Sequence, residues 1–462
     1  MDKKFTILGA GLAGISASYH LGHAQCIIFE KQSHPFGHIY SSEINGFTWD
    51  EGPHVSFTKN EYVRALFEKT SGGNYLERHV QPVNYYQGHW IDHPVQSNLY
   101  AVPEPLRTAC LNGLLNARKT YSDDYCPANY REWLEAAFGL SLTDHFSEKY
   151  TKKYWTVESR LLHTNWVGNR VYSPDVNTVL QGYEKKPAVS THYITSIRYP
   201  RNGGYKSFAL DLFKHSETHL NHEVERVDLP GKIVYFRNGS KHNYNTLIVT
   251  MPLPEFISYC SPPEDVFLAA NGLRCSELFL INVEVAHPAI RKEPWLYVYD
   301  EEKYSTRINF TESLSPNNAP TGMSGIQVEV YFSEYKPKMI SDDDLTETVL
   351  MELLQMGLIE SREMIKGHFL KKVPYANVIF DLNYATHLNK VLTWLETYGL
   401  NRETDDLEPM TNWDQKLESK EQLGSLILSG RFGQWKYFWT DDCILRGSFI
   451  NKSLNSVNPL LE

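Results

Sequence analysis

Short apolar runs and one helical pattern alternate over the first thirty residues. Residues 4–8 (KFTIL) and 25–30 (QCIIFE) read as short buried strands, and residues 12–21 (LAGISASYHL) place apolar side chains at helical spacing. The pattern predicts one strand–turn–helix–strand unit at the N-terminus.

The remaining chain mixes helical and strand patterns. Residues 60–160 are predicted to be mainly helical, including 128–139 (ANYREWLEAAFG), and a further helix is expected over 205–215. Strand patterns occupy 222–250 and 277–335. Residues 341–360 read as an amphipathic helix that begins at Ser341 and three aspartates. A last apolar strand, 425–430 (SLILSG), precedes a C-terminal helix.

Composition narrows the class of protein. The 462 residues are 42% apolar and 22% charged, which is ordinary for a globular protein of two or three domains. A net charge of −10 argues against a nucleic-acid partner. The six cysteines form no CxxC pair, and the histidines show no metal-ligand spacing, so we expect no metal site and a reducing, cytoplasmic setting. No apolar stretch is long enough to predict a membrane span.

A glycine-rich turn joins the first strand to the first helix. Gly9 permits the tight turn, Gly11 lets the backbone approach a pyrophosphate, and Gly14 lets helix and strand pack closely. Glu30 ends the second strand, where a carboxylate can bind ribose hydroxyls. Lys31 follows it. The N-terminal unit is therefore predicted to bind a dinucleotide.

The segment after Glu30 indicates whether the dinucleotide is NAD or FAD. Residues 30–57 (EKQSHPFGHIYSSEINGFTWDEGPHVSF) resemble the FAD-dependent amine oxidase and protoporphyrinogen oxidase superfamily. Gly37 matches the second glycine of that family's GG pair, whereas Phe36 replaces the first. His54 matches a histidine that the family places beside the flavin. The resemblance implies FAD as the cofactor.

Further matches resemble the UDP-galactopyranose mutase branch of this superfamily. They run in order through 88–103 (GHWIDHPVQSNLYAVP), 129–139 (NYREWLEAAFG), 149–155 (KYTKKYW), 199–208 (YPRNGGYKSF) and 430–437 (GRFGQWKY). The resemblance implies a substrate site containing Gln96, Asn129, Trp133, Arg307, Arg431 and Tyr437. Trp133 lies on an apolar helical face and fits core packing equally well.

The resemblance also implies roles around the flavin. It implies catalytic roles for His54, Arg307 and Arg431. Cofactor contacts are expected from Gly9, Gly11, Gly14, Glu30, Lys31, Gly37, His54, Gly430, Arg431, Asp442, Cys443 and Ile444.

Three positions depart from the mutase pattern. Glu148 stands where the mutases carry an arginine, and Leu314 and Asn377 stand near positions usually occupied by tyrosines. A carboxylate beside a diphosphate would be repulsive, because a diphosphate carries about two negative charges. Either the local alignment is off, another cation compensates, or the substrate differs from that of the mutases.

The expected fold is α/β with α+β subdomains. We predict a Rossmann-like FAD-binding domain, a helical subdomain and an antiparallel-sheet substrate domain. The predicted boundaries are a βαβ unit at 1–60, a mainly helical substrate-binding subdomain at 61–200, a returning FAD-binding segment at 201–260, a sheet-containing substrate domain at 261–400, a charged surface insertion at 401–424 and a C-terminal FAD-binding segment at 425–462.

Two functions remain open from the sequence. As a nucleotide-sugar pyranose/furanose mutase, the protein would use the N5 atom of reduced FAD as a covalent nucleophile on the anomeric carbon, with NAD(P)H as reductant. As an amine oxidase-like or protoporphyrinogen oxidase-like oxidoreductase, it would pass a hydride to oxidised FAD. The three departures favour the oxidoreductase. The mutase is favoured by the matches at Gln96, Asn129, Trp133, Arg307 and Arg431. The sequence does not indicate the oligomeric state.

Overall fold

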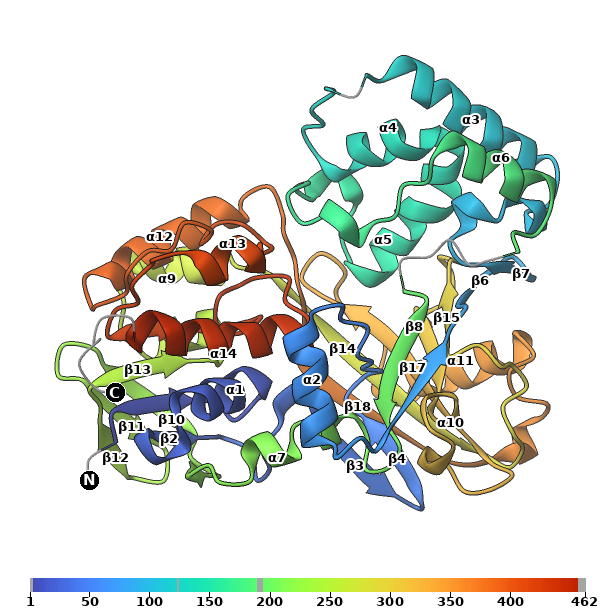
Figure 1. Cartoon of the computed structure of the whole chain (residues 1–462). Helices are drawn as coiled ribbons and strands as arrows, with labels where there is room; N and C mark the ends of the chain where they lie inside the picture. The colour runs from blue at the N-terminus through green and yellow to red at the C-terminus, as the bar shows by residue number, and fades with distance from the viewer. Residues whose placement is uncertain (1–2, 123, 189–193, 456–462) are drawn as a thin grey trace.

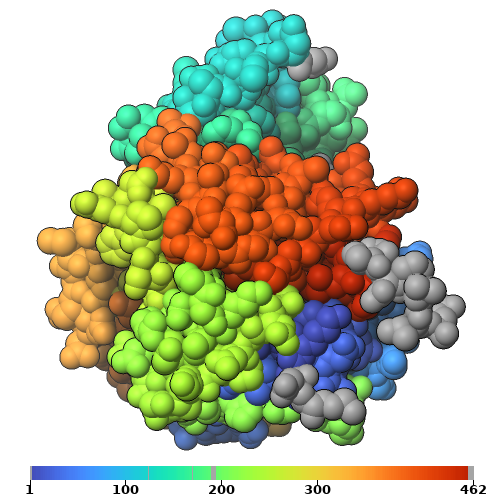
Figure 2. Space-filling view, turned by 90° about the vertical axis from the view of Figure 1, so that its left-hand side faces the viewer, coloured from blue at the N-terminus to red at the C-terminus, as the bar shows by residue number. Residues whose placement is uncertain are grey.

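A computed structural model describes residues 3–122, 124–188 and 194–455. Its chain divides into a half built on a parallel sheet, hereafter the parallel-sheet half, a large mostly antiparallel sheet and a helical lobe (Figure 1). Figure 2 shows residues around 380–430 as an orange band between the helical lobe above and the parallel-sheet half below.

The parallel-sheet half is built on five strands in the order β19-β13-β1-β2-β9. Its strands are β1 (Phe5–Leu8), β2 (Cys26–Phe29), β9 (Thr218–His219), β13 (Thr246–Val249) and β19 (Leu426–Leu428). Helix α1 (Leu12–Leu21) packs on α14 (Thr440–Asn455), so the N-terminal unit meets the C-terminal helix (Figure 1). The predicted βαβ unit is confirmed to within one residue at each boundary.

A seven-stranded sheet of order β18-β14-β17-β16-β15-β6-β7 forms the second half. Its strands are β6 (Val83–Tyr86), β7 (His89–Asp92), β14 (Cys275–Val285), β15 (Trp295–Val298), β16 (Arg307–Phe310), β17 (Ser324–Phe332) and β18 (Ile365–Val378). All neighbours pair antiparallel except β15 and β6. Helix α11 (Asp342–Gln355) has Ser341 as its N-cap, which accepts a hydrogen bond from the Asp344 N–H at 3.1 Å, as the sequence predicts.

The helical lobe lies beside the β6–β7 end of this sheet (Figure 1). It contains α3 (Leu106–Thr120), α4 (Tyr130–Leu142), α5 (Glu148–Tyr154) and α6 (Val176–Glu184). Residues 60–160 are not helical throughout, because 75–92 contribute three strands. Two of these strands extend the large sheet, so long-range pairing outweighs the local helical signal.

The remaining elements connect these parts. The helices are α2 (Glu61–Thr70), α7 (Leu210–Phe213), α8 (Leu253–Ser258), α9 (Glu264–Asn271), α10 (Thr311–Leu314), α12 (Tyr384–Glu396) and α13 (Trp413–Glu418). The strands are β3 (Ser41–Ile44) with β4 (Phe47–Asp50), β5 (Tyr75–His79) with β8 (Ser196–Pro200), and the sheet β10 (Val224–Asp228), β11 (Ile233–Phe236) and β12 (Lys241–Asn243). Within the described residues, no helix has the length and apolarity needed to cross a membrane.

Residues 401–424, which their charges predict to be a surface insertion, turn several of those charges inward. The side chain of Lys416 is 4% exposed, and that of Glu403 is 6% exposed. Buried charges need partners, and the two residues form an ion pair at 2.7 Å.

Candidate functional site

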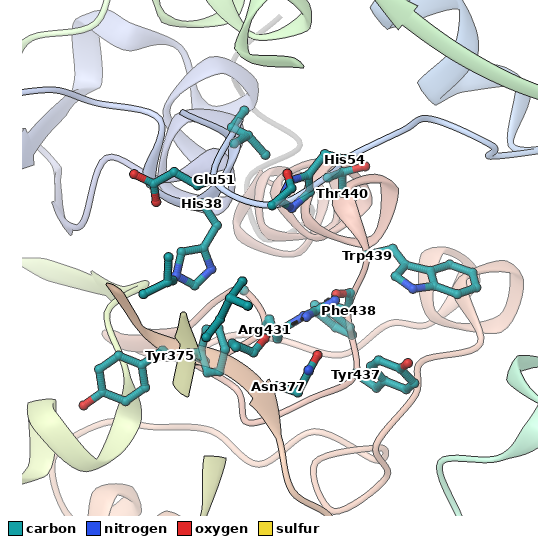
Figure 3. Close-up of a pocket in the computed structure, with 18 of the residues that line it drawn as sticks. His38, Glu51, His54, Tyr375, Asn377, Arg431, Tyr437, Phe438, Trp439 and Thr440 are labelled. Atoms are coloured by element: carbon teal, nitrogen blue, oxygen red, sulfur yellow. Dashed lines mark hydrogen bonds between the residues drawn. The ribbon is translucent and has the colours of Figure 1, made fainter. Parts of the chain in front are cut away.

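A cavity of about 810 Å³ lies where the three parts meet. Its wall comes from the glycine turn and the ends of β1 and β2, from residues 51–58, from α5 and the loop after it, from β15, β16 and β18, and from 430–443. Figure 3 shows His38, His54, Asn377, Arg431 and Tyr437 from several of these segments around one space.

The N-terminus of α1 opens into one end of this cavity. Gly11 is the N-cap residue and brings no side-chain hydrogen bond, and the first turn of the helix contains no acidic residue. Gly9 has φ 104°, and a Cβ on Gly14 would lie 2.1 Å from the Gly9 carbonyl oxygen. Gly9 and Gly11 line the cavity, whereas Gly14 permits the close packing behind it. A helix N-terminus with no capping side chain is suited to bind phosphate.

Glu30 holds the neighbouring turn together. Its carboxylate accepts hydrogen bonds from the Ala10 N–H at 2.7 Å and the Gln32 N–H at 2.9 Å. Glu30 and Lys31 both line the cavity, and the Lys31 ammonium lies 3.4 Å from Glu255. The carboxylate is thus fixed at the cavity edge, where it retains lone pairs for a ribose.

Phe36 and Gly37 both have left-handed backbone conformations. Phe36 has φ 86°, a left-handed conformation that favours glycine, and its ring is buried against Phe213. A Cβ on Gly37 would lie 3.0 Å from the Gly11 Cα. The two glycine turns therefore approach each other closely, and side-chain atoms are excluded from the space between them.

His54 lies at the other end of the cavity. Its Nδ1 donates to the Gly52 carbonyl oxygen at 2.9 Å. Burial lowers the pKa of His54 to about 4, opposed by that hydrogen bond and reinforced by the charges of Arg431 and Arg307. The imidazole is neutral at pH 7, so its Nε2 is left as an acceptor.

The residues of the C-terminal segment that are expected to contact the cofactor divide into two groups. Gly430, Arg431 and Cys443 line the cavity. Asp442 and Ile444 lie behind its lining. The Asp442 carboxylate accepts hydrogen bonds from the Trp413 indole and the Trp439 N–H, both at 2.6 Å, and the Ile444 carbonyl accepts from the Ser16 hydroxyl at 3.1 Å. These two residues position the start of α14.

The cavity fits a flavin dinucleotide. It joins an open helix N-terminus and a fixed carboxylate at one end to a neutral histidine and a second helix N-terminus, that of α14, at the other. Gly430 has φ 86°, and a Cβ added at this position would lie 2.7 Å from the Ala13 Cβ. The absence of a side chain therefore lets the Gly430 backbone approach helix α1 closely. A pyrophosphate at α1 would direct the rest of the cofactor along this cavity.

Arg431 and Arg307 both line the cavity, but their guanidinium groups bind different kinds of partner. The Arg431 guanidinium donates to the carbonyls of Phe438 at 2.7 Å and Ala376 at 3.2 Å. Arg307 donates from Nε and Nη2 to the two oxygens of Glu329, both at 2.7 Å. Over the ranges that the structure describes, Arg431 forms no ion pair with a carboxylate, whereas the charge of Arg307 is balanced by the buried carboxylate of Glu329.

Gln96 and Tyr437 also line the cavity, and Gln96 donates to the Tyr172 carbonyl at 2.7 Å. Asn129 and Trp133 do not belong to the described cavity lining. The Asn129 side chain caps α4 by accepting from the Glu132 N–H at 3.1 Å, and Trp133 packs on the core and stacks on Tyr130 at 5.9 Å. Their helix reaches the cavity through Tyr130 and Phe138 instead.

Two of the three departures point away from the cavity. Glu148 accepts from the Ser159 N–H at 3.2 Å and lies 3.9 Å from Arg131 in a separate hollow on the outer side of the lobe. Leu314 is a buried core residue. Only Asn377 lines the cavity, where its side-chain oxygen accepts from the Tyr154 hydroxyl at 3.1 Å. Glu148 therefore does not repel an anion bound beside Arg431.

The sequence pattern missed Arg170, which lies in a region without clear periodicity. Its guanidinium carbon is 3.1 Å from the centre of the Trp439 ring, and its Nη2 donates to the Tyr437 carbonyl at 3.1 Å. Its side chain is 10% exposed and lines the cavity, and Nη1 is buried without a hydrogen-bond partner in the described part of the chain. A buried cation with an unused donor is suited to bind an anion.

The cavity also contains aromatic side chains that no single motif identified. Tyr150, Tyr154, Tyr297 and Tyr299 all line it, and the Tyr150 ring contacts the rings of the other three. Nearer the glycine turn, burial and the charges of His54 and Arg431 lower the pKa of His38 to about 3. The site is therefore aromatic, with two neutral histidines and a few fixed cations.

Known structures share this architecture. A crystal structure of reduced UDP-galactopyranose mutase matches with a TM-score of 0.86 and 22% identity, over 100% of this chain and 96% of that one. A protein from Exiguobacterium sp. 255-15, provisionally described as a protoporphyrinogen oxidase, matches with a TM-score of 0.69 and 15% identity, over 98% of both chains. Putrescine oxidase bound to putrescine matches with a TM-score of 0.61 and 12% identity, also over 98% of both. At these identities the matches show the fold.

A comparison with models of protein families shows which family the chain belongs to. The model described as flavin containing amine oxidoreductase matches residues 12–390, most of the chain. This match identifies a flavoprotein enzyme whose cofactor is of the FAD type. The protein belongs to the flavin containing amine oxidoreductase family.

Proposed function

We propose that the protein is a flavin-dependent nucleotide-sugar mutase that interconverts pyranose and furanose forms of a sugar attached to a nucleoside diphosphate. The observation that carries this proposal is the pair Arg431 and Arg170. Both guanidiniums line the cavity near Tyr437. Among the described residues Arg431 forms no ion pair with a carboxylate, and Arg170 forms one long ion pair, 3.6 Å from its Nη2 to Asp442. Two fixed cations match the charge of a diphosphate, which must be held as it leaves the sugar.

The chain's own residues would bind and orient this substrate. Arg431 is aimed by two backbone carbonyls, and Arg170 by the ring of Trp439, so both cations are held before substrate arrives. The tyrosines around Tyr150 provide flat apolar faces and hydroxyl groups for a sugar or a base. Asn377 and Tyr154 supply a further polar pair.

The cofactor would supply the bond-making chemistry. Reduced FAD offers a nucleophilic nitrogen, N5, for the anomeric carbon, and NAD(P)H would be the reductant. His54 would accept a hydrogen bond through its neutral Nε2 beside this reacting centre. The aromatic walls and the helical lobe would exclude water from the opened sugar.

One observation favours a second function. Glu329 balances the charge of Arg307, so one of the two arginines expected from the sequence to bind a diphosphate is already paired. An amine or another reduced carbon substrate needs no cation clamp, and such a substrate would pass a hydride to oxidised flavin. The match to putrescine oxidase is compatible with this alternative at the level of the fold.

A panel of nucleotide sugars tests the proposal. Purified protein is incubated with each sugar under anaerobic conditions, once oxidised and once reduced with dithionite, and the products are separated by chromatography. The proposal expects a furanose product from at least one nucleotide sugar with the reduced protein only. An absence of any product with the whole panel, together with peroxide formation from an amine, would establish the second function instead.

A further inference from the structure

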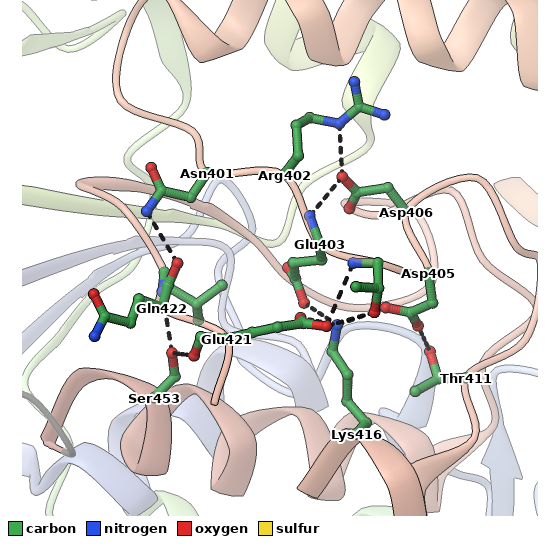
Figure 4. Close-up of polar contacts among 12 residues, drawn as sticks. Asn401, Arg402, Glu403, Asp405, Asp406, Thr411, Lys416, Glu421, Gln422 and Ser453 are labelled. Atoms are coloured by element: carbon green, nitrogen blue, oxygen red, sulfur yellow. Dashed lines mark hydrogen bonds and ion pairs between the residues drawn. The ribbon is translucent and has the colours of Figure 1, made fainter. Parts of the chain in front are cut away.

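A closed loop behind the cavity wall lies directly against both Tyr437 and Arg170. Residues 405–411 form this loop, hereafter the bracket loop, in the segment that its charges predict to be a surface insertion. Figure 4 shows the polar contacts at its base. The Thr411 hydroxyl donates to the Asp405 carboxylate at 2.6 Å and so joins the two ends of the loop.

Two buried lysines fix the base of the bracket loop. Lys436 donates to the Asp405 carboxylate at 2.6 Å, to the Asp405 carbonyl at 2.6 Å and to the Thr411 hydroxyl at 3.2 Å. Lys416 donates to Asp405 at 2.5 Å, and the two lysine side chains are 1% and 4% exposed. Hydrogen-bonded ion pairs at this depth hold a single geometry, because leaving either charge unpaired is costly.

The carboxylates at the base of the bracket loop are balanced by a lysine of the protein itself, which occupies the place that a metal ion would take. In the described part of the chain, the acidic oxygens that lie close enough to share a metal belong to Glu403, Asp405 and Glu421. The Lys416 ammonium lies among them, at 2.7, 2.5 and 2.5 Å. Glu403 also pairs with Arg446 of α14 through two contacts of 2.6 Å, which ties the network to the helix that begins at the cavity.

The far side of the bracket loop touches the two cavity residues. The Pro409 carbonyl accepts from the Tyr437 N–H at 2.6 Å. The Met410 sulfur accepts from Nε of Arg170 at 3.5 Å, and a Cβ on Gly168 would lie 2.5 Å from the Met410 methyl carbon. Arg170 in turn donates to the Tyr437 carbonyl at 3.1 Å. Adjacent residues of one loop therefore hold adjacent parts of the cavity wall.

We propose that Met410 is a positioning residue, which through the bracket loop sets the place of Arg170 in the cavity. The methionine fills the space beside Gly168 and accepts a hydrogen bond from Nε of the Arg170 guanidinium, which stacks on the Trp439 ring. The consequence for substrate binding rests on the proposed function, in which Arg170 binds a diphosphate. The placement of Arg170 itself does not depend on that function.

Hydrogen–deuterium exchange on the flavin-loaded protein tests the placement. Met410→Ala removes the sulfur and the methyl group, and Met339→Ala is the matched control because Met339 is 87% exposed. Faster backbone exchange is expected within 163–172 for Met410→Ala, with unchanged flavin content and with no change for Met339→Ala. Thr411→Val, which opens the base of the loop without changing side-chain size, should have the same effect in smaller measure. Unchanged exchange in 163–172 in both Met410→Ala and Thr411→Val would overturn the proposal.

A double-mutant cycle tests the consequence, with UDP as the probe and flavin fluorescence or absorbance as the signal. Met410→Ala should weaken UDP binding roughly five- to tenfold in the wild-type background and not at all in the Arg170→Ala background, because residues that act through one another are non-additive. An equal loss in both backgrounds would overturn the claim that Met410 acts through Arg170. If the wild-type protein binds neither UDP nor any other nucleoside diphosphate of the panel, the proposed function fails, and the exchange result alone decides the placement.

Discussion

Arg307 and Glu329 are direct cross-strand partners on β16 and β17, and their side chains form a two-pronged ion pair with both contacts at 2.7 Å. Glu329 also accepts from the Tyr331 hydroxyl at 2.7 Å and is 1% exposed. The mutase resemblance expects Arg307 to bind the substrate. In the structure, the positive charge of Arg307 already neutralises the buried carboxylate of Glu329.

Removing one partner of this pair should be much more damaging than removing both. Arg307→Ala leaves Glu329 buried and uncompensated, and we expect a loss of about 3–5 kcal/mol in the free energy of unfolding. Adding Glu329→Gln to Arg307→Ala should recover most of that loss, as measured by denaturant unfolding of the flavin-loaded protein. Equal stability of the single and double variants would contradict the burial of this pair.

Glu30 should control cofactor affinity. Glu30→Ala removes the acceptor for the Ala10 N–H and a ligand for the ribose, so the dissociation constant for FAD should rise roughly 10- to 100-fold. Titration of the apoprotein by flavin fluorescence measures this change. Glu43→Ala is the control, because Glu43 lies exposed on β3 away from the cavity lining. A Glu30→Ala variant that binds FAD like the control would remove Glu30 from the cofactor site.

Arg431 should matter for turnover more than for cofactor retention. Its guanidinium is held by the carbonyls of Phe438 and Ala376, which orient it into the cavity without a carboxylate partner. Arg431→Ala should lower kcat/KM for the nucleotide sugar by roughly 100-fold or more, because a charged hydrogen bond to the diphosphate is lost. Flavin content, read from the absorbance spectrum, should stay near one per chain. Loss of flavin with unchanged activity per bound flavin would contradict this division of roles.

His54 should make the protein less stable in mild acid. Folding lowers the pKa of this imidazole from its usual 6.5 to about 4, so between these values the unfolded chain binds a proton that the folded chain does not. The contribution of neutral His54 is therefore fully present above pH 6.5 and is lost as the pH falls towards 4.

The variant His54→Asn should isolate this contribution. Its amide can still donate to the Gly52 carbonyl but does not titrate. Between pH 7.5 and pH 5, the wild-type protein should lose about 1–2 kcal/mol more stability than His54→Asn. Denaturant unfolding at the two pH values measures the difference. Parallel losses in the two proteins would mean that the histidine titrates normally in the folded state.

The first half of the cofactor site could be predicted from sequence because it is local. Gly9, Gly11 and Glu30 lie within one strand–helix–strand unit, and the spacing itself determines which of them meet. Phe36 is the exception: an aromatic residue occupies a left-handed position that favours glycine, and its burial in a core cluster together with a 2.8 Å hydrogen bond from its N–H to the Ala10 carbonyl holds it there.

The substrate side could be predicted only in part, because its geometry depends on distant partners. Arg170 comes from a loop without periodicity and gains its place from Trp439 and Met410, which are remote in sequence. Glu329 stands in a strand pattern typical of a core, so its pairing with Arg307 could not be expected. Asn129 and Trp133 match a binding motif, yet a helix cap and core packing account for both. Motif matches identified the right helix but not the side chains that face the cavity.

The redox state of the flavin during turnover tests the proposed function most directly. The dithionite-reduced protein is mixed anaerobically with UDP-galactopyranose, or with the nucleotide sugar from the panel that is converted, while the flavin absorbance and the products are followed together. We predict that many equivalents of furanose form per flavin while the absorbance stays that of reduced flavin. Product formation only by the oxidised protein, with one flavin reduced for each substrate consumed, would contradict the mutase proposal.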